Sequence, residues 1–163
     1  MLRLKGRPWK ALVNFRDRVL KDLGDRINAI VVYGSVVRGE YREDSDIDVL
    51  IVGSDKEIKS KVSKISYEID YENNFETFIT LVYYTKEEIE HRIKVGSPFI
   101  YEILKDGVAL HDDGTFKGIR EKMLELADEF LADAKLCLEH LRLRSAINST
   151  YYAMFHASQA ILA

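Results

Sequence analysis

The chain has 163 residues, of which 47% are hydrophobic and 31% charged, and its formal net charge is −3. This size suits one domain, or a modest domain with an appendage, and the hydrophobic content is enough for a buried core. The negative balance excludes a general attraction for nucleic-acid backbones, and we interpret the basic residues among the first ten positions as a solvated arm. No apolar run reaches the roughly 20 residues that span a bilayer, and one cysteine cannot form an internal disulfide. We therefore expect a globular, cytoplasmic protein that does not enter membranes.

Helical and extended patterns alternate over the first two thirds of the chain, which predicts a mixed α and β order. A glycine after an apolar helical face is typical of a helix end. Helix starts are indicated by Thr85-x-x-Glu88 and by Ser97-Pro98. The expected elements are helix 8–23, strand 27–32, strand 47–52, helix 56–71, strand 75–84, helix 85–95, a short helix from residue 98 and a small strand 108–110.

From Thr115 onward the pattern is helical alone, with apolar residues at steps of three or four that predict helices over 117–141 and 145–162. Asp112-Asp113-Gly114 marks a boundary, so we expect one domain at 1–114 and another at 115–163. Two helices rarely make a stable core by themselves. The second part is therefore expected either to pair with another copy of the chain, as a homo-oligomer, or to be a truncated piece of a longer fusion, which the apolar end at 161–163 favours.

Two carboxylates open the second expected strand. Side chains alternate along a strand, so Asp46 and Asp48 should project from one face with Cα atoms roughly 7 Å apart. Two carboxylates aimed at a common centre repel each other unless a cation lies between them, and hard oxygen ligands of this kind suit Mg²⁺ or Mn²⁺. The pair therefore predicts a metal site.

A glycine-serine turn follows the first expected strand. Gly34 allows close backbone approach, while the Ser35 hydroxyl and the amides after it can bind phosphate oxygens. Alone, such a turn and such a pair of aspartates are often only a loop and a solvated strand edge, but together they favour a metal-nucleotide site. Arg38 has two open interpretations, since it can reach a phosphate or form a surface ion pair with Glu40 or Glu43.

Gly34-Ser35-x-x-Arg38-Gly39 and Ser45-Asp46-Ile47-Asp48-Val49 resemble the signature of the minimal nucleotidyltransferases of the DNA polymerase beta superfamily. The resemblance extends from about residue 10 to about residue 112, because the segment 97–110 is similar to that family's closing helix-turn-strand. It implies an α+β fold, a mixed sheet with flanking helices, and a nucleoside triphosphate with Mg²⁺ as ligands. The implied reaction is transfer of a nucleotidyl group from ATP or another triphosphate to a protein or small acceptor.

In that resemblance Asp46 and Asp48 are the catalytic and metal-binding residues, and Gly34, Ser35 and Arg38 bind the nucleotide. The family commonly has a third carboxylate on a later strand, and its position falls here on Thr80, which cannot deprotonate a nucleophile. Glu76 is a weak catalytic substitute, because it lies four residues earlier, about 13 Å away along an ideal strand. The alternative function is therefore a catalytically weak nucleotide-binding module that regulates or interacts through its helices.

The segment 144–157 resembles the start of a HEPN domain, a helical bundle often found with minimal nucleotidyltransferases in prokaryotic toxin-antitoxin systems. The resemblance implies an incomplete all-α helical hairpin and a place in such a system. HEPN ribonucleases carry an arginine followed four to six residues later by a histidine. No such spacing occurs between 117 and 163, where Arg144 and His156 lie too far apart, so we do not predict nuclease activity.

Overall fold

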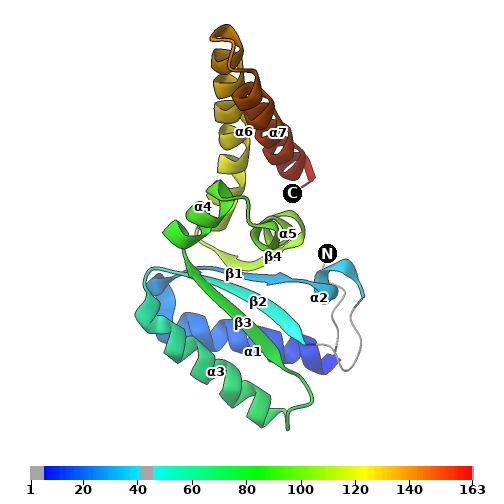
Figure 1. The fold of residues 1–163 in the computed structure, drawn as a ribbon. Helices are drawn as coiled ribbons and strands as arrows, with labels where there is room; N and C mark the ends of the chain where they lie inside the picture. The colour runs from blue at the N-terminus through cyan, green and yellow to red at the C-terminus, as the bar shows by residue number, and fades with distance from the viewer. Residues whose placement is uncertain (1–5, 41–45, 163) are drawn as a thin grey trace.

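The computed structural model describes residues 6–40 and 46–162 (Figure 1). In these ranges, four strands and seven α-helices follow one another in a mixed order. The elements are α1 (Gly6–Leu23), η1 (Gly24–Arg26), β1 (Ile27–Tyr33), α2 (Ser35–Arg38), β2 (Ile47–Gly53), η2 (Lys56–Ile58), α3 (Lys59–Glu72), β3 (Ile79–Thr85), α4 (Lys86–Lys94), α5 (Pro98–Asp106), β4 (Val108–Asp112), α6 (Thr115–Glu139) and α7 (Leu143–Leu162).

The strands form one mixed sheet in the order β3-β2-β1-β4. Antiparallel pairs join β1 to β2 and β1 to β4, whereas β3 runs parallel to β2 after the crossover through α3. The predicted α+β class, with a mixed sheet, flanking helices and a helical hairpin at the end, is confirmed.

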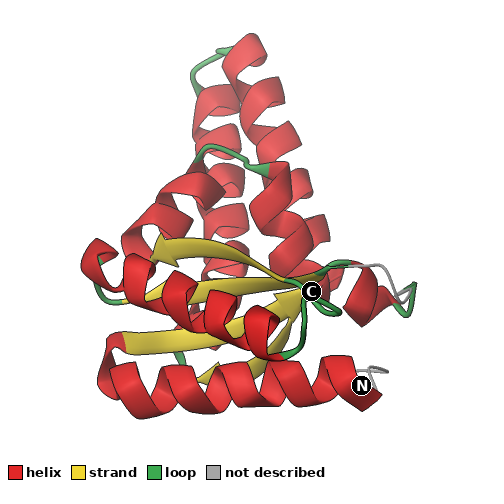
Figure 2. Cartoon of the chain, turned by 90° about the horizontal axis from the view of Figure 1, so that it is seen from below, coloured by secondary structure: helices red, strands yellow, loops and turns green. Residues whose placement is uncertain are grey.

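Helices cover both faces of the sheet. Residues of α1 and α3 cover one face, and α4, α5 and the start of α6 cover the other (Figure 1). Figure 2 views the sheet from the side of α1 and α3. The two central strands are apolar along nearly their whole length because both of their faces are covered, as is usual for the inner strands of such a sheet.

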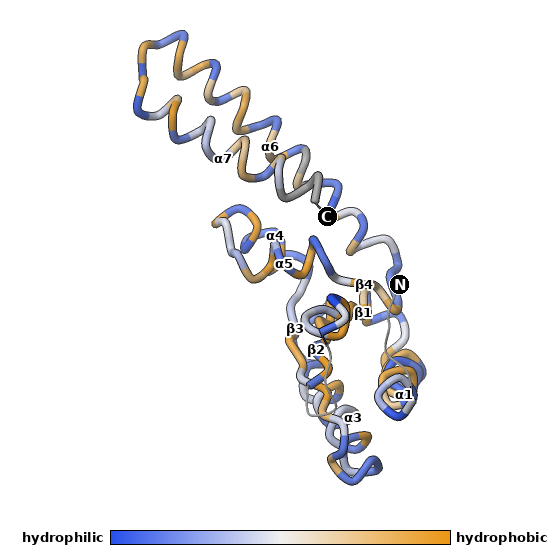
Figure 3. The backbone as a smooth tube through the Cα atoms, turned by 90° about the vertical axis from the view of Figure 1, so that its right-hand side faces the viewer, coloured by the Kyte–Doolittle hydropathy of each residue, from blue (hydrophilic) through white to orange (hydrophobic). Residues whose placement is uncertain are grey.

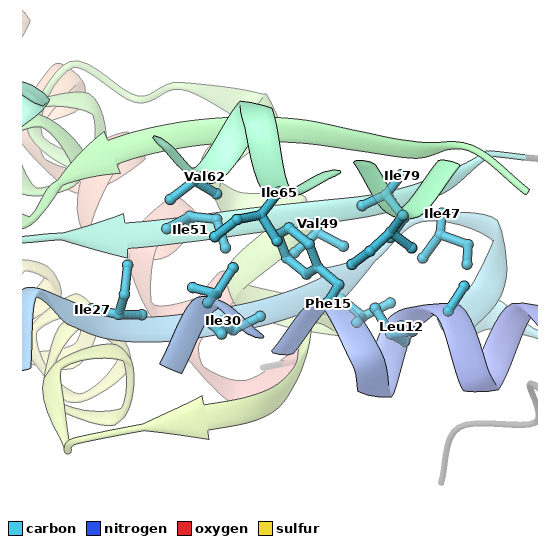
Figure 4. Close-up of a cluster of buried hydrophobic side chains, with 14 of the residues drawn as sticks. Leu12, Phe15, Ile27, Ile30, Ile47, Val49, Ile51, Val62, Ile65 and Ile79 are labelled. Carbon is cyan, nitrogen blue, oxygen red and sulfur yellow. The ribbon is translucent and has the colours of Figure 1, made fainter. Parts of the chain in front are cut away.

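The core beneath α1 and α3 holds the sheet in place (Figure 4). Leu12 and Phe15 of α1 are fully buried with Ile30 and Val49 of the strands, and Ile65 of α3 joins them. Fully burying a large apolar side chain contributes roughly 1.5–3 kcal/mol. Stability in this part of the molecule therefore comes from apolar contacts on the face opposite the side chain of Asp48.

Two predicted helix starts are confirmed, although the Ser97 side chain makes no capping hydrogen bond at the second one. The Thr85 hydroxyl accepts a hydrogen bond from the Glu88 backbone N–H at 3.3 Å, and the Glu88 carboxylate accepts one from the Thr85 N–H at 3.0 Å. This reciprocal pair is the capping box of α4. Pro98 is at the start of α5, as its missing N–H favours.

The predicted start of the third strand is wrong. Residues 73–78 form a turn, and β3 begins only at Ile79. Asn74 and Phe75 have positive φ angles of 54° and 56°, and the Phe75 N–H donates to the Asp70 carbonyl at 2.8 Å. The chain folds back here instead of running straight into the sheet, which the high β propensity of the segment did not reveal.

The helices α6 and α7 form a hairpin that extends away from the sheet, with hydrophobic and hydrophilic residues interspersed along both (Figures 1 and 3). The first turns of α6 bury Phe116, Ile119 and Met123 in the core that the sheet shares with α5. At the same end of the hairpin, Tyr101 of α5 contacts Phe155 of α7, with ring centroids 5.0 Å apart. The division into domains at residue 114 stays a prediction.

Within the described ranges, no helix is both long enough and apolar enough to cross a membrane.

Candidate functional site

The candidate site lies at the end of the sheet where β1 finishes and β2 and β3 begin. Tyr33, the last residue of β1, is paired with Asp48 of β2, and Asp48 is paired with Thr80 of β3. Because neighbouring strands lie about 4.8 Å apart, this register places the turn after β1, the aspartate and the threonine side by side across three strands.

Gly34 begins the turn after β1 and is required there for two reasons. Its φ of 75° and ψ of −148° are strained for a residue with a side chain. A Cβ at this position would also lie only 2.5 Å from the Asp48 carboxylate. Its carbonyl accepts from the N–H groups of Val37 and Arg38 at 3.2 and 3.3 Å, which starts the short helix α2 with Ser35 as its first residue. The group close to the Gly34 backbone in this structure is thus a carboxylate, and the approach of a phosphate stays a prediction.

The structure brings Asp46, Asp48 and Thr80 together. The Thr80 hydroxyl donates to the Asp46 carboxylate at 3.2 Å. Burial raises the pKa of Asp48, the Asp46 charge raises it further, and the Arg38 charge opposes the rise. This is the electrostatic signature of two facing carboxylates that a cation would stabilise.

The residues present fit a divalent metal ion. The described residues contain no cluster of three or more acidic, histidine or cysteine side chains that could bind a metal by itself, so an ion here would need ligands beyond those residues. Mg²⁺ is often bound by only one or two carboxylates, with water and substrate phosphates supplying the remaining oxygens. Asp46 and Asp48 supply that minimal set beside the glycine turn.

The surroundings of Arg38 are compatible with both of its predicted roles, a surface ion pair and contact with a phosphate. Its Nε donates to the Glu40 carboxylate at 3.1 Å, in an exposed ion pair. Its charge also lowers the pKa of Asp48, so the guanidinium is close enough to act on the site. Glu43, the other predicted partner, and Ser45 lie outside the described residues.

Glu76 lies in the turn before β3, and the site does not include it. Its exposed carboxylate forms an ion pair with Arg7 in the first turn of α1. The predicted separation of Glu76 from Thr80 rested on a straight strand, which the structure replaces with a turn. A catalytic role of Glu76 stays a prediction, and its observed partner is a basic residue of another element.

Asp70 of α3 is a titratable group beside the site that the sequence reasoning missed. It is buried beneath the start of β3, where its carboxylate accepts from the Ile79 N–H at 3.2 Å. Burial raises the pKa of Asp70 to about 6, against the effect of this hydrogen bond, and the Asp46 charge adds to the rise. The one available signal was its position directly after Ile69 on the apolar face of an amphipathic helix.

A family model described as "Nucleotidyltransferase domain" matches residues 12–110. Two "Putative protein adenylyltransferase" sequences of Methanocaldococcus jannaschii are similar to the chain. One is 46% identical over 44 residues, covering 27% of this chain and 44% of that protein. The other is 28% identical over 95 residues, covering 58% of this chain and 89% of that protein.

Among solved structures, a toxin-antitoxin crystal structure with AMP-PNP is similar at a TM-score of 0.49 and 14% identity, covering 79% of this chain and 97% of that one. The matched family model is the stronger finding, because it includes the glycine turn, both aspartates, the strands β1 to β3 and the start of β4. The chain therefore belongs to the nucleotidyltransferase domain family.

Proposed function

We propose that the chain is a metal-dependent nucleotidyltransferase that moves a nucleotidyl group from ATP or another nucleoside triphosphate to a protein or small acceptor. The observation that carries the proposal is the convergence of Gly34, Asp46 and Asp48 at one end of the sheet, within the residues that the family model matches. Members of this family typically use divalent metals. The names of the two archaeal relatives support a protein as the acceptor.

Each residue of the site has a chemical role in this proposal. Asp46 and Asp48 would hold Mg²⁺, or Mn²⁺, and the ion would neutralise charge that develops on the phosphates. The Ser35 hydroxyl would bind a phosphate oxygen, and Arg38 would leave Glu40 to contact a second one. In the reaction, an acceptor oxygen forms a bond to the α-phosphorus while the bond to the bridging oxygen breaks and pyrophosphate leaves. The acceptor proton passes to solvent, because Thr80 cannot take it.

A second candidate function is a nucleotide-binding module with weak catalysis that acts through its helices. The observation that favours it is the pairing of Thr80 with Asp48, since a hydroxyl occupies the position where a third carboxylate would face the other two. In either case we propose that residues 115–163 are a HEPN-like helical segment, and that the chain acts in a toxin-antitoxin type system.

The test is a calorimetric titration of ATP with and without Mg²⁺. Changing Asp46 and Asp48 together to Asn should abolish the Mg²⁺-dependent part of the affinity and should not lower the thermal unfolding midpoint. The matched control changes Asp128 and Asp133, two exposed aspartates of α6, to Asn and should bind like the wild type. Equal Mg²⁺-dependent affinity in the site variant and the control would contradict the proposal.

A further inference from the structure

Four aromatic side chains form an exposed cluster at the end of α3 and in the turn before β3: Tyr67, Tyr71, Phe75 and Phe78. Phe75 lies at its centre, with ring centroids 6.1 Å from Tyr67, 6.0 Å from Tyr71 and 6.0 Å from Phe78. The rings of Phe75 and Phe78 are stacked, with an interplanar angle of 26°. All four residues are exposed, from 41% for Phe75 to 66% for Tyr71, so this contiguous apolar surface is open to solvent.

The backbone keeps Phe75 at the surface against its own conformational preference. A positive φ is a genuine outlier for a bulky residue such as Phe75, and the preceding Asn74 has a positive φ as well. Several hydrogen bonds hold the turn. The shortest are from the Asn73 side chain to the Ile69 carbonyl and from the Phe75 N–H to the Asp70 carbonyl, both at 2.8 Å. The turn therefore fixes an aromatic surface where a polar loop would have been the ordinary choice.

The cluster begins beside the carboxylates. The Phe78 carbonyl accepts from the N–H of Ile47, the residue between Asp46 and Asp48, at 2.8 Å. Phe78 also precedes Thr80 by two residues, a separation of about 7 Å along an extended chain. A group bound at Phe78 would therefore lie at the same end of the sheet as the reacting centre, while Tyr67 and Tyr71 extend the cluster along α3.

The sheet order assigns this side of the site to the acceptor. The glycine turn that would hold the leaving phosphates follows β1, the carboxylates belong to the start of β2, and the cluster leads into β3. In phosphoryl transfer, the attacking and leaving oxygens lie on opposite sides of the phosphorus, roughly in line. If pyrophosphate leaves on the β1 side, the acceptor arrives on the β3 side, where the aromatic rings are.

The charges around the cluster indicate what kind of acceptor fits. Arg18 forms a two-bond ion pair with Glu72 at 2.8 and 2.6 Å, and Arg7 pairs with Glu76. These two arginines are thus already neutralised by carboxylates, and neither of them offers excess positive charge to a polynucleotide backbone. Exposed rings in a neutral setting instead favour contact with another aromatic ring.

We propose that the cluster is the docking site for the acceptor, and that it binds an aromatic side chain of a polypeptide next to the hydroxyl that receives the nucleotidyl group. The proposal rests on the proposed function for the reaction, whereas the docking itself needs no nucleotide. The hydroxyl oxygen forms the new bond to the α-phosphorus, pyrophosphate leaves, and the hydroxyl proton passes to solvent.

The docking is tested by titrating the ¹⁵N-labelled chain with short peptides and following its amide resonances. The probes are acetyl-Gly-Ser-Phe-Ser-Gly-amide, the same peptide with leucine in place of phenylalanine, and a short oligouridylate. The phenylalanine peptide should shift amides of residues 67–80 in a saturable way, more strongly than the leucine peptide, and the oligouridylate should not. Absence of shifts with the phenylalanine peptide, or tighter binding of the oligouridylate to the same amides, would overturn the proposal.

Variants identify the rings that bind. Phe78→Ala and Tyr71→Ala should each weaken binding of the phenylalanine peptide roughly two- to twelve-fold, as loss of one aromatic pair does. Tyr151→Ala, which removes an exposed ring of α7, is the matched control and should bind like the wild type. Unchanged peptide affinity in both cluster variants would overturn the docking site even if ATP binds normally. Loss of Mg²⁺-dependent ATP binding with intact peptide binding would instead concern only the proposed function.

Discussion

Thr80 is the residue that separates the two candidate functions. Its hydroxyl already contacts Asp46, so Thr80→Asp would place a third carboxylate beside the pair without a change of backbone. Because general base catalysis typically contributes 10²–10⁴-fold, we expect transfer of labelled nucleotide to protein to rise by roughly 10²-fold or more. Thr80→Asn, which has a similar shape and no charge, should not show this rise.

The same transfer assay examines Glu76. We expect Glu76→Gln to change transfer little, because its carboxylate is engaged with Arg7. A wild-type rate typical of an enzyme, lost in Glu76→Gln, would show that Glu76 supplies the base.

Asp70 gives a second prediction, about stability and pH. Its pKa in the folded chain is about 6, above the ordinary 3.8, so between these values the folded state holds a proton that the unfolded state has released. Stability should therefore fall as pH rises from about 4 to 6 and stay lower above that. A shift of this size corresponds to about 3 kcal/mol.

Asp70→Asn removes the buried charge and keeps an oxygen that can accept from Ile79. We expect it to raise the free energy of unfolding at pH 7 by up to about 3 kcal/mol and to have almost no effect at pH 3.5. Urea unfolding at the two pH values measures this. An equal change at both would mean that the charge of Asp70 is not the cause.

A residue of the site could be predicted where the pattern that identifies it lies within a few neighbouring positions of the sequence. Gly34, Asp46 and Asp48 could be predicted because a turn residue and a two-residue alternation are visible in the sequence itself. Asp70 could not, since its burial depends on how α3 packs against a strand that follows it. The exposed turn at Phe75 could not be predicted either, because a bulky residue with positive φ contradicts local preference.

At the scale of elements, a buried histidine lies at the contact between α5 and α7. The Tyr101 hydroxyl donates to the Ile93 carbonyl at 3.0 Å, so it accepts from Nδ1 of His156 at 2.5 Å. The other ring nitrogen, Nε2, is buried with no hydrogen-bond partner in the part of the chain that the structure describes. Aromatic rings of Tyr101, Phe130, Tyr152 and Phe155 surround the imidazole.

Burial in this apolar setting lowers the pKa of His156 below its ordinary 6.5. As pH falls through about 6.5, His156 binds a proton in the unfolded chain but not in the folded chain. The free energy of unfolding should therefore decline towards pH 5, and the contribution of His156 should be fully present above pH 7. His156→Phe should reduce this decline, whereas the exposed His140, changed to Gln, should leave it as it is. Urea unfolding across pH 5–8 measures the slope, and an unchanged slope in His156→Phe would contradict the assignment.

Element boundaries show where periodicity is sufficient and where it is not. The predicted helices of the hairpin, 117–141 and 145–162, correspond to α6 and α7 within two residues, since long amphipathic patterns are reliable. The short helix α2 was expected only as a turn, because four residues carry no helical period. Its formation depends on the conformation of the preceding glycine.

At the scale of the whole molecule, the outer face of α7 predicts self-association. Leu143, Ile147, Tyr151 and Met154 recur at steps of three or four and are each at least 58% exposed. The predicted contact residue Ile161 lies outside the side chains that the structure describes. Burying the three aliphatic side chains Leu143, Ile147 and Met154 contributes roughly 4–9 kcal/mol before the entropy of association is counted.

Light scattering at micromolar concentration should therefore show a dimer or larger species, and Ile147→Asp with Met154→Asp should dissociate it. Lys135→Asp with Glu139→Lys, a change of two polar residues of α6, is the control and should leave the assembly intact. A monomer that neither change affects would contradict self-association. It would mean that the packing of α7 on Tyr101 is enough to stabilise the hairpin.

The class of fold was predictable and the strand order was not. Alternation of helical and extended patterns indicates an α+β domain, but no local pattern states that β1 is central or that β4 joins its free edge. That order depends on pairs far apart in the sequence, such as Val32 with Val108. The three-strand arrangement of the site could be inferred only through the family resemblance.

The anchoring of α6 also has a mechanical consequence. Its first turns are fixed in the core by Phe116, Ile119 and Met123, while the rest of the helix reaches outward as far as Glu139. That outer arm is about 24 Å long at 1.5 Å per residue, so a tilt of about 5° at the anchor moves the tip by roughly 2 Å. Because Tyr101 also ties α7 to α5, a force applied at the tip would act on α5 as well as on the strands beneath the start of α6.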